Sequence, residues 1–430
     1  MDTHNILKII FLSILLISAL ELVLHLLIKH LRKNFQWLIT AEDRQPIFPA
    51  AVLKKYFSHG FDPELGWVRK ANTYAEESSN TVGEATGALK KSAYHINPRG
   101  ARLNSGHEKL PLKISTYGDS FVFSRQVNDD KTWQWYLSEL TQTNVQNFGV
   151  GNYGIDQSLL RLKREYKQNQ TPIVIIGVVP ETIVRILCVW KHYSEYGNIL
   201  AFKPRFKITN GHLDAIRNPI DNERKFLKVH QYLDEINDQD YFYDNKFKKD
   251  ILCFPYLVSL SRSSRRNVPL IQALLKDQLL SLTRKKIETR RDRPWEMVLD
   301  RNFKIVRGLY QNKDATELFL GILENLTGFA KQNEFYPVFL LMPYLHDILN
   351  IKEHGGYYDT FVSQAEKIIT TIDLTHALMN SDCLQELYSS DFYGGHLSEK
   401  GNQFVSKILY EKLFGLYPMI FKGSENLVAN

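Results

Sequence analysis

The pattern of apolar and polar positions separates an apolar stretch near the start of the chain from a longer region of mixed character. Twenty residues, Ile9 to Ile28, are almost wholly apolar and are long enough to cross a bilayer core of roughly 30 Å as a helix. Glu21 and His25 interrupt this stretch one helical turn apart, so they would share a face. No small-residue cleavage site follows it, so we expect an uncleaved anchor rather than a signal peptide.

From residue 112 onward, short apolar runs alternate with longer stretches of helical period. This pattern predicts strands at 112–117, 145–148, 172–179, 336–341 and 368–374, and helices at 132–140, 156–167, 315–331 and 402–414. Such alternation is typical of the α/β class, in which helices cover a parallel sheet. The polar stretch at 71–92, rich in Ser, Thr, Gly and Glu, is expected to be loop.

The alternation stops between residues 185 and 313. A hairpin around Asn210-Gly211 and several helical patterns indicate a mostly helical insertion or cap in this region. The sequence therefore predicts five parts, which are an N-terminal membrane anchor at 1–33, a connector at 34–93, the first part of the α/β domain at 94–184, the insertion at 185–313 and the second part of the domain at 314–430.

The formal net charge of +7 adds little to this picture. The densest basic run is Arg284, Lys285, Lys286, Arg290, Arg291 and Arg293. A solvated helix face is the favoured interpretation of this run, and attraction to an anionic membrane or an acidic polymer is the alternative. No nucleic-acid-binding module accompanies the charge, so no nucleic-acid partner is expected. The three cysteines form neither a disulfide framework nor a metal-binding pattern.

Ser120 is the most interesting polar residue, because it follows a predicted strand directly and precedes a helix. The carboxyl end of a parallel strand exposes a serine hydroxyl, and N–H groups of the following helix can stabilise an oxyanion there. Gly118 allows the tight turn. The alternative is that Ser120 only caps the next helix, which is the commoner role of an isolated Gly-Asp-Ser tripeptide.

Three segments make a catalytic role the better interpretation. Residues 117–121 (YGDSF), 147–157 (NFGVGNYGIDQ) and 391–402 (DFYGGHLSEKGN) resemble, in order and strand context, the sequence blocks of the SGNH/GDSL hydrolases. Residues 94–102 (YHINPRGAR) are similar to the segment that leads into this domain in many bacterial members. The resemblance covers roughly 94–180 and 315–415, and it implies a flavodoxin-like three-layer α/β/α sandwich with a parallel sheet.

The resemblance also assigns catalytic roles. Ser120 is the implied nucleophile and His396 the base that accepts its proton. The carboxylate that orients such a histidine usually lies three residues before it, where this chain has Tyr393. We expect Asp391 to take that role, since Gly394-Gly395 lets the loop fold back, and Asp373 is the reserve.

The oxyanion hole departs furthest from the family pattern. The resemblance implies donors at Ser120, Gly151 and Asn152. The third block normally supplies an asparagine, but this chain has Glu181 there, and an ionised carboxylate would repel an oxyanion. Losing one such donor costs about 2.7–4 kcal/mol of transition-state stabilisation. Asp119, Glu181 and Arg205 are the expected substrate contacts.

The resemblance implies a serine esterase or acyltransferase that acts on acyl, above all O-acetyl, esters of a carbohydrate or cell-surface glycan. No metal or organic cofactor is expected. The alternatives are an SGNH-fold binding or assembly protein with weak or no activity, and a lipid-directed esterase. A glycan substrate favours an extracytoplasmic domain on a single-pass membrane protein, whereas the basic cluster after the anchor, residues 29–33, favours the opposite side.

Overall fold

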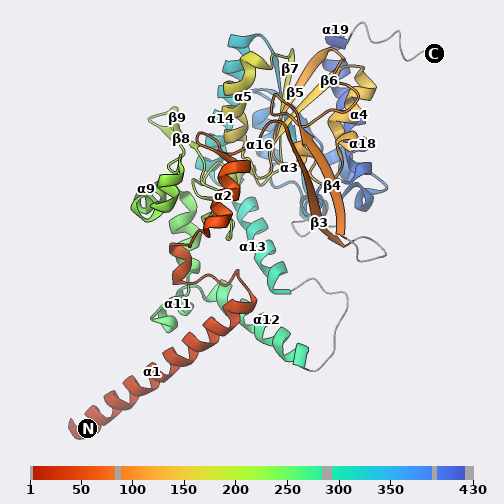
Figure 1. Cartoon of the computed structure of the whole chain (residues 1–430). Helices are drawn as coiled ribbons and strands as arrows, with labels where there is room; N and C mark the ends of the chain where they lie inside the picture. Colours follow the sequence, from red (N-terminus) through yellow and green to blue (C-terminus); the bar gives the residue numbers. More distant parts are fainter. Residues whose placement is uncertain (1–2, 83–88, 283–292, 390–394, 422–430) are drawn as a thin grey trace. The chain divides into compact units, whose positions relative to one another are not determined.

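The computed structural model describes residues 3–82, 89–282, 293–389 and 395–421 (Figure 1). The chain divides into two compact units, each described by itself below. The sheet unit comprises Ala51–Leu187, Lys203–Asn222 and Ile305–Asn430. The helical unit comprises Met1–Ala50, Cys188–Phe202 and Glu223–Lys304.

Five parallel strands form the centre of the sheet unit. They are β5 (Leu112–Gly118), β6 (Asn144–Gly149), β7 (Ile173–Val178), β10 (Tyr336–Leu341) and β11 (Thr370–Asp373). Their order across the sheet is β11-β10-β7-β5-β6, and every neighbouring pair is parallel. Counted in chain order this is 2-1-3-4-5, the flavodoxin-like order. The predicted α/β class and parallel sheet are confirmed.

Helices cover both faces of this sheet, because the strands carry apolar side chains in both directions. On one face, strand residues such as Ile114, Ile175 and Leu340 pack in a single buried cluster with α4 (Trp133–Thr141) and α18 (Glu399–Leu416). On the other face, α5 (Ile155–Glu165) and α14 (Lys313–Asn333) contact the alternate strand positions, for example through the rings of Phe319 and Phe339. The result is the three-layer sandwich that the resemblance implies.

Shorter elements complete the sheet unit. They are β1 (Phe61–Asp62), β2 (Gly66–Trp67), β3 (Thr73–Val82), β4 (Leu89–Ile96), α3 (Ser120–Phe123), α6 (Thr182–Arg185), β8 (Arg205–Thr209), β9 (His212–Ile216), α15 (Leu345–His354), α16 (Asp359–Ala365), α17 (Thr375–Met379) and α19 (Pro418–Phe421). The expected loop at 71–92 is wrong in its described part, because β3 and β4 pair there as an antiparallel ribbon. Where its side chains are described, the ribbon contributes Tyr94 and Ile96 to a small buried cluster with Phe123.

The hairpin at Asn210-Gly211 is confirmed as β8–β9, and both turn residues have positive φ, as a two-residue hairpin turn requires. This hairpin packs on α14 and α5, so residues 203–222 group with the sheet unit although they lie inside the predicted insertion. Residues 188–202 and 223–304 of the predicted insertion group with the N-terminal fifty residues.

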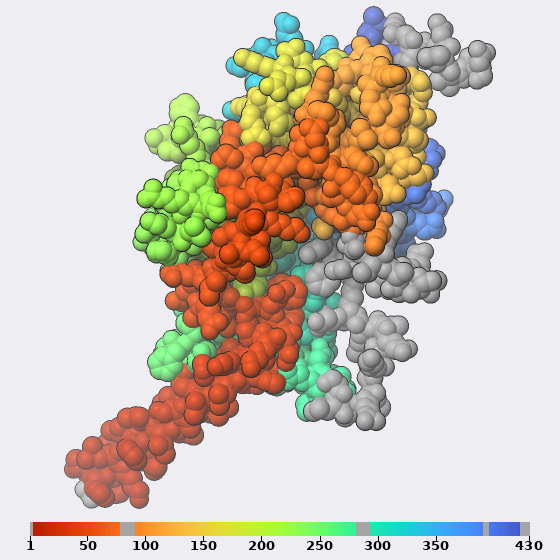
Figure 2. Space-filling model, in the orientation of Figure 1, coloured from red at the N-terminus to blue at the C-terminus, as the bar shows by residue number. Residues whose placement is uncertain are grey.

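The helical unit is built from α1 (Thr3–Asn34), α7 (Lys191–Ser194), α8 (Glu223–Leu227), α9 (Leu233–Gln239), α10 (Lys248–Asp250), α11 (Tyr256–Arg262), α12 (Ser264–Leu282) and the first part of α13 (Arg293–Leu309), while α2 (Ala50–His59) leads out of it. Among the residues that the structure describes, α1 is the one helix long and apolar enough to cross a membrane. Its first turns are exposed, and Figure 2 shows them bare of other chain segments in that view.

One face of the second half of α1 belongs to the core of the helical unit. Ile28 and Leu31, together with Phe35 just beyond the helix, form a buried cluster with Leu270 and Leu274 of α12. The apolar stretch from Ile9 to Ile28 is therefore divided in the structure. Its first part is exposed, and its last turns contact other residues of the helical unit.

Candidate active site

Ser120 lies in the first turn of α3, immediately after β5. Gly118 ends the strand with its backbone packed against β7, where an added Cβ would lie 2.0 Å from the Gly177 carbonyl oxygen. Only glycine fits at this crossing, and it lets the chain turn sharply into the helix. The turn brings Ser120 to the carboxyl edge of the sheet, at the end of the strand between β7 and β6.

Asp119 fixes this turn. Its Oδ1 accepts the Phe121 N–H at 2.9 Å, which caps α3. Its Oδ2 accepts the Val179 N–H at 3.0 Å and an Arg185 N–H at 3.2 Å. Burial raises the pKa of the Asp119 carboxyl, while Arg185 and the two amides act in the opposite direction. The described contacts of Asp119 thus tie the turn after β5 to the loop after β7, a positioning role that the sequence did not predict.

His396 reaches Ser120 from a segment 276 residues away. Its Nε2 lies 2.8 Å from the serine Oγ, and the two residues are only 5% and 6% exposed. The rings of Phe121 and Tyr344 flank the imidazole, with centroids 5.1 and 6.3 Å from it. Serine and histidine are therefore buried and within hydrogen-bond reach of each other, the arrangement that an activated nucleophile needs.

The segment that carries His396 is held by backbone contacts on its own loop. The His396 carbonyl oxygen accepts the Ser389 N–H at 2.8 Å and the Ser389 hydroxyl at 3.0 Å. Gly395 has φ +88° and packs so closely that an added Cβ would lie 3.0 Å from the Ser389 carbonyl oxygen. Glycine here allows the chain to turn back on itself just before the histidine.

The predicted orienting acid, Asp391, lies outside the described residues, as does Tyr393. The reserve candidate is described. Asp373 ends β11, and its carboxylate accepts hydrogen bonds from the Thr375 N–H at 2.9 Å and from the Thr375 hydroxyl at 2.5 Å. None of the hydrogen bonds described for Asp373 joins it to His396.

The loop after β6 lies beside the turn that carries Ser120. The Val150 N–H donates to the Gly118 carbonyl at 2.9 Å, and an added Cβ on Gly149 would lie 2.3 Å from the Phe123 nitrogen. The Gly151 carbonyl oxygen accepts the Trp67 indole N–H at 3.0 Å. Asn152 is exposed and has φ +68°, a conformation that asparagine tolerates better than most residues. Both predicted oxyanion donors of this block therefore lie at the same sheet edge as Ser120.

Glu181 and Arg185 form an ion pair on the first turn of α6. The distance between Arg185 Nη2 and Glu181 Oε2 is 2.7 Å, and the Tyr344 hydroxyl lies 3.4 Å from the same carboxylate oxygen. Burial alone would lower the pKa of the Arg185 guanidinium, but Glu181, Tyr344 and Asp119 outweigh it and hold that pKa above its usual value. The Glu181 carboxylate is thus paired with a buried cation, the Arg185 guanidinium.

Sequence reasoning missed Arg185 and Tyr344. Arg185 also donates to the Tyr153 carbonyl at 3.0 Å, so it joins the segments that follow β5, β6 and β7. The one sequence signal for it is the spacing of four residues from Glu181, which places the two on one helix face. Burial raises the pKa of Tyr344 well above its usual value, so its phenol stays protonated and can donate to Glu181. Nothing in the sequence links Tyr344 to the site.

Arg205 occupies the first position of β8 and is buried. Its guanidinium donates to the Leu187 carbonyl at 2.8 Å and to the Phe206 carbonyl at 3.2 Å. The hydrogen bonds described for Arg205 thus go to the main chain, and its role as a substrate contact stays a prediction. Within the described ranges, no group of three or more His, Cys, Asp or Glu side chains is placed to hold a metal ion.

No family model matches the chain, and no curated protein matches it. Solved structures similar to it include a protein assigned to the G-D-S-L family of lipolytic proteins from Desulfitobacterium hafniense, at 14% identity over 70% of this chain and 98% of that one, with a TM-score of 0.30. An acetyl xylan esterase is similar at 10% identity over 70% of this chain and 100% of that one, with a TM-score of 0.33. A lipase/acylhydrolase from Enterococcus faecalis is similar at 11% identity over 71% and 96%, with a TM-score of 0.32.

Proposed function

We propose that this chain is a membrane-anchored serine esterase or acyltransferase of the SGNH type, with Ser120 as its nucleophile and His396 as its base. The observation that carries this proposal is the 2.8 Å contact between Ser120 Oγ and His396 Nε2 at the carboxyl edge of a parallel sheet. The comparisons, with TM-scores near 0.3, carry none of it. The resemblance of the three sequence blocks supplies the substrate class, an O-acyl ester on a carbohydrate or glycan.

The reaction follows from these two side chains. His396 Nε2 takes the proton of the Ser120 hydroxyl as Oγ attacks the ester carbonyl, and the C=O electron pair moves to oxygen to give a tetrahedral oxyanion. When this intermediate collapses, the C–O bond to the sugar breaks and the imidazolium returns its proton to the leaving alcohol. An acyl-serine remains. Water or a second sugar hydroxyl, deprotonated by His396, then takes the acyl group and frees Ser120.

Asp391 is the proposed partner of His396. Its carboxylate would hold the imidazole in the tautomer that presents a bare Nε2 to Ser120. Asp391 follows Ser389 by two residues in the sequence, and the Ser389 N–H donates to the His396 carbonyl oxygen.

The oxyanion donors are the backbone N–H of Ser120, which as the first residue of a helix has no partner within that helix, and the loop of Gly151 and Asn152. The objection raised by Glu181 loses force because Arg185 pairs with its carboxylate at 2.7 Å. An oxyanion at this edge would meet an ion pair rather than an isolated negative charge, so the substitution of Glu181 for an amide is compatible with activity.

Membrane anchoring through α1 is supported by its exposed apolar first half. Its second half packs into the helical unit, which argues against removal of the segment as a signal peptide. The basic cluster in the last turns of α1, residues 29–33, is a weak guide to orientation, because Arg32 is paired with Asp43 at 2.7 Å inside the protein. An extracytoplasmic sheet unit, as a glycan substrate requires, is the placement we propose.

A serine-directed fluorophosphonate tests the assignment. The full-length protein in detergent should be labelled at Ser120, and labelling should be lost in Ser120→Ala but kept in the matched variant Ser105→Ala, whose serine is exposed. Wild-type protein that hydrolyses acetyl esters yet stays unlabelled, or a labelled Ser120→Ala protein, would refute the assignment. A folded protein without labelling or activity would instead favour the binding-protein alternative.

A further inference from the structure

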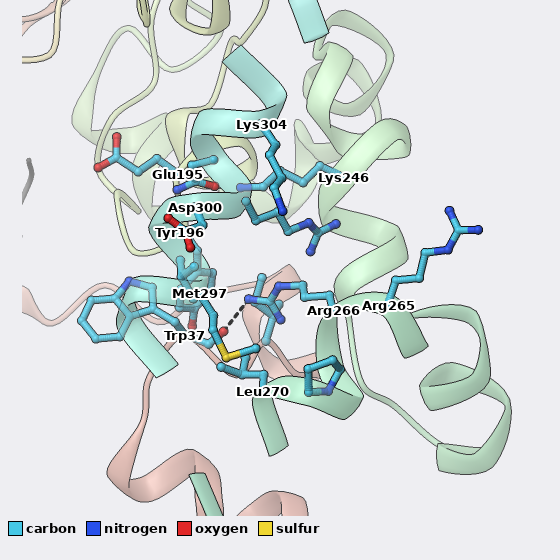
Figure 3. A pocket seen from close by; sticks show the side chains of 15 residues that line it. Trp37, Glu195, Tyr196, Lys246, Arg265, Arg266, Leu270, Met297, Asp300 and Lys304 are labelled. Carbon is cyan, nitrogen blue, oxygen red and sulfur yellow. Dashed lines mark hydrogen bonds between the residues drawn. The ribbon is translucent and has the colours of Figure 1, made fainter. Parts of the chain in front are cut away.

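A cavity lies wholly within the helical unit. Its volume is about 540 Å³, within the range of small-molecule sites. It is bounded by α12 and α13, by the segment just after α1 and by Lys246 (Figure 3). In Figure 3, Lys246 and Lys304 lie on one side of the space, and Leu270 and Met297 lie on the other. The charged side and the apolar side of the cavity meet, in this view, where Arg266 lies beside Met297.

The charged side is strongly basic. Five cations line the cavity, namely Lys246, Arg265, Arg266, Arg301 and Lys304, against two lining carboxylates, Glu195 and Asp300. Glu195 is already paired with Lys191. Asp250, which does not itself line the cavity, accepts hydrogen bonds from Arg301 Nη2 at 2.8 Å and Nη1 at 2.9 Å. Its carboxylate also lies 3.6 Å from the Arg266 guanidinium. Within the described chain, no ion pair is formed by Lys246, Arg265 or Lys304.

Lys246 shows what this imbalance does. It is buried, and its described hydrogen bond is to the Ser194 carbonyl oxygen. Burial is the main cause that lowers the pKa of Lys246 to about 7; the cations Arg266 and Arg301 act in the same direction, and Asp250 acts against them. Burial likewise lowers the pKa of Arg266 to about 10. The negative charge near Lys246 and Arg266 does not offset the effect of burial on their pKa values. An anion bound in the cavity would offset it.

The apolar side continues into the core around α1. Leu270 lines the cavity and also belongs to the buried cluster that contains Ile28 and Leu31 of α1. Trp37 and Ile39, which follow α1 directly, line the cavity as well. A ligand with an aliphatic chain would therefore find an apolar wall continuous with the helix proposed to enter the membrane.

We propose that this cavity binds a phosphate-bearing headgroup, and that the favoured source is a lipid whose chains lie along the apolar wall. Phosphate matches the site because it carries up to two negative charges on several acceptor oxygens, which the planar fork of Arg and the ammonium groups of Lys bind well. A carboxylate would neutralise only one of the unpaired cations. This site is separate from Ser120 and does not depend on the proposed esterase activity.

The test measures binding to the full-length protein in detergent by calorimetry at neutral pH. The probes are dioctanoyl phosphatidic acid, which has a phosphate and chains, dioctanoyl phosphatidylcholine, whose phosphate is masked by choline, and inorganic pyrophosphate, which has no chains. The test variant is Lys246→Gln/Lys304→Gln. The matched control is Lys249→Gln/Lys276→Gln, which removes two exposed lysines outside the cavity. Lys304→Gln alone is included because this lysine is exposed and its loss leaves the fold intact.

We expect phosphatidic acid to bind more tightly than the other two probes. The test variant should weaken its binding about tenfold or more, Lys304→Gln less, and the control by less than about twofold. Equal binding of pyrophosphate with the same loss in the test variant would support the phosphate site and identify a free phosphate compound as its source. The proposal would be overturned if the test variant and the control changed the binding of phosphatidic acid equally. It would also be overturned if neither phosphatidic acid nor pyrophosphate bound.

Discussion

At the scale of single residues, the site combines what a sequence can reveal with what it cannot. Ser120 and His396 were predictable because residues 117–121 and 391–402 resemble two sequence blocks of the SGNH/GDSL hydrolases. Arg185 and Tyr344 were not, since their importance comes from contacts with Asp119 and Glu181 that only the folded sheet edge creates. From the sequence, the charge of Glu181 is expected to repel an oxyanion, but the ion pair of Glu181 with Arg185 is visible only in the structure.

The two candidate acids make a sharp prediction at this scale. Asp391→Asn should lower kcat by roughly 10²–10⁴-fold with a much smaller change in KM, because tautomer control matters mainly in the transition state. Asp373→Asn should be mild for kcat, since the described hydrogen bonds of that carboxylate go to Thr375. Steady-state hydrolysis of an acetyl ester measures both. Reversed severities would make Asp373 the orienting acid.

At the scale of elements, α1 and α11 show how a polar residue inside an apolar stretch is used. Glu21 is buried, and its carboxylate accepts the N–H groups of Tyr256 at 2.5 Å and Leu257 at 2.9 Å at the start of α11. His25, one turn along the same face, lies 2.9 Å from the Tyr256 hydroxyl. The sequence predicted that Glu21 and His25 share a face, but not that the face contacts a segment more than 200 residues away.

Glu21→Leu should therefore destabilise the helical unit although it makes α1 more apolar. The loss of a helix cap typically costs about 0.5–2 kcal/mol, and two part-buried amides at the start of α11 would lose their acceptor. Glu21→Gln keeps one carbonyl acceptor and should cost less. Denaturant unfolding of the full-length protein measures the difference, with the exposed Leu16→Ala as a control. Equal stability of Glu21→Leu and wild type would mean that this contact contributes nothing.

At the scale of the whole molecule, the strand pattern and the block order were enough to predict the sheet, because each strand is recognisable from an apolar run in its own sequence. The grouping of residues into two units was not predictable. The hairpin β8–β9 joins the sheet unit because it packs on α14, and the second half of α1 joins the helical unit because Ile28 and Leu31 pack on α12. Both results depend on contacts between segments that are distant in sequence.

Truncation separates the membrane part of α1 from its core part. Removal of residues 1–20 takes away exposed apolar side chains and should give a protein that is released from membranes and keeps its thermal stability. Removal of residues 1–34 also deletes Ile28 and Leu31, leaves Leu270 and Leu274 uncovered, and should lower the melting temperature by several degrees. Thermal unfolding with membrane fractionation measures both effects. Identical stability of the two truncations would contradict a core role for the second half of α1.

The central claim, that His396 activates Ser120 to carry an acyl group, is tested most directly by trapping that acyl group. The full-length protein is mixed with an activated acetyl ester, quenched in acid before turnover is complete, and its peptides are sequenced by mass spectrometry. We predict an acetyl group on Ser120 in wild-type protein and Asn152→Ala, a much slower appearance of it in His396→Gln, and none at this position in Ser120→Ala. Acetylation of another residue that accounts for turnover, or Ser120 acetylation that forms equally fast without His396, would contradict the account.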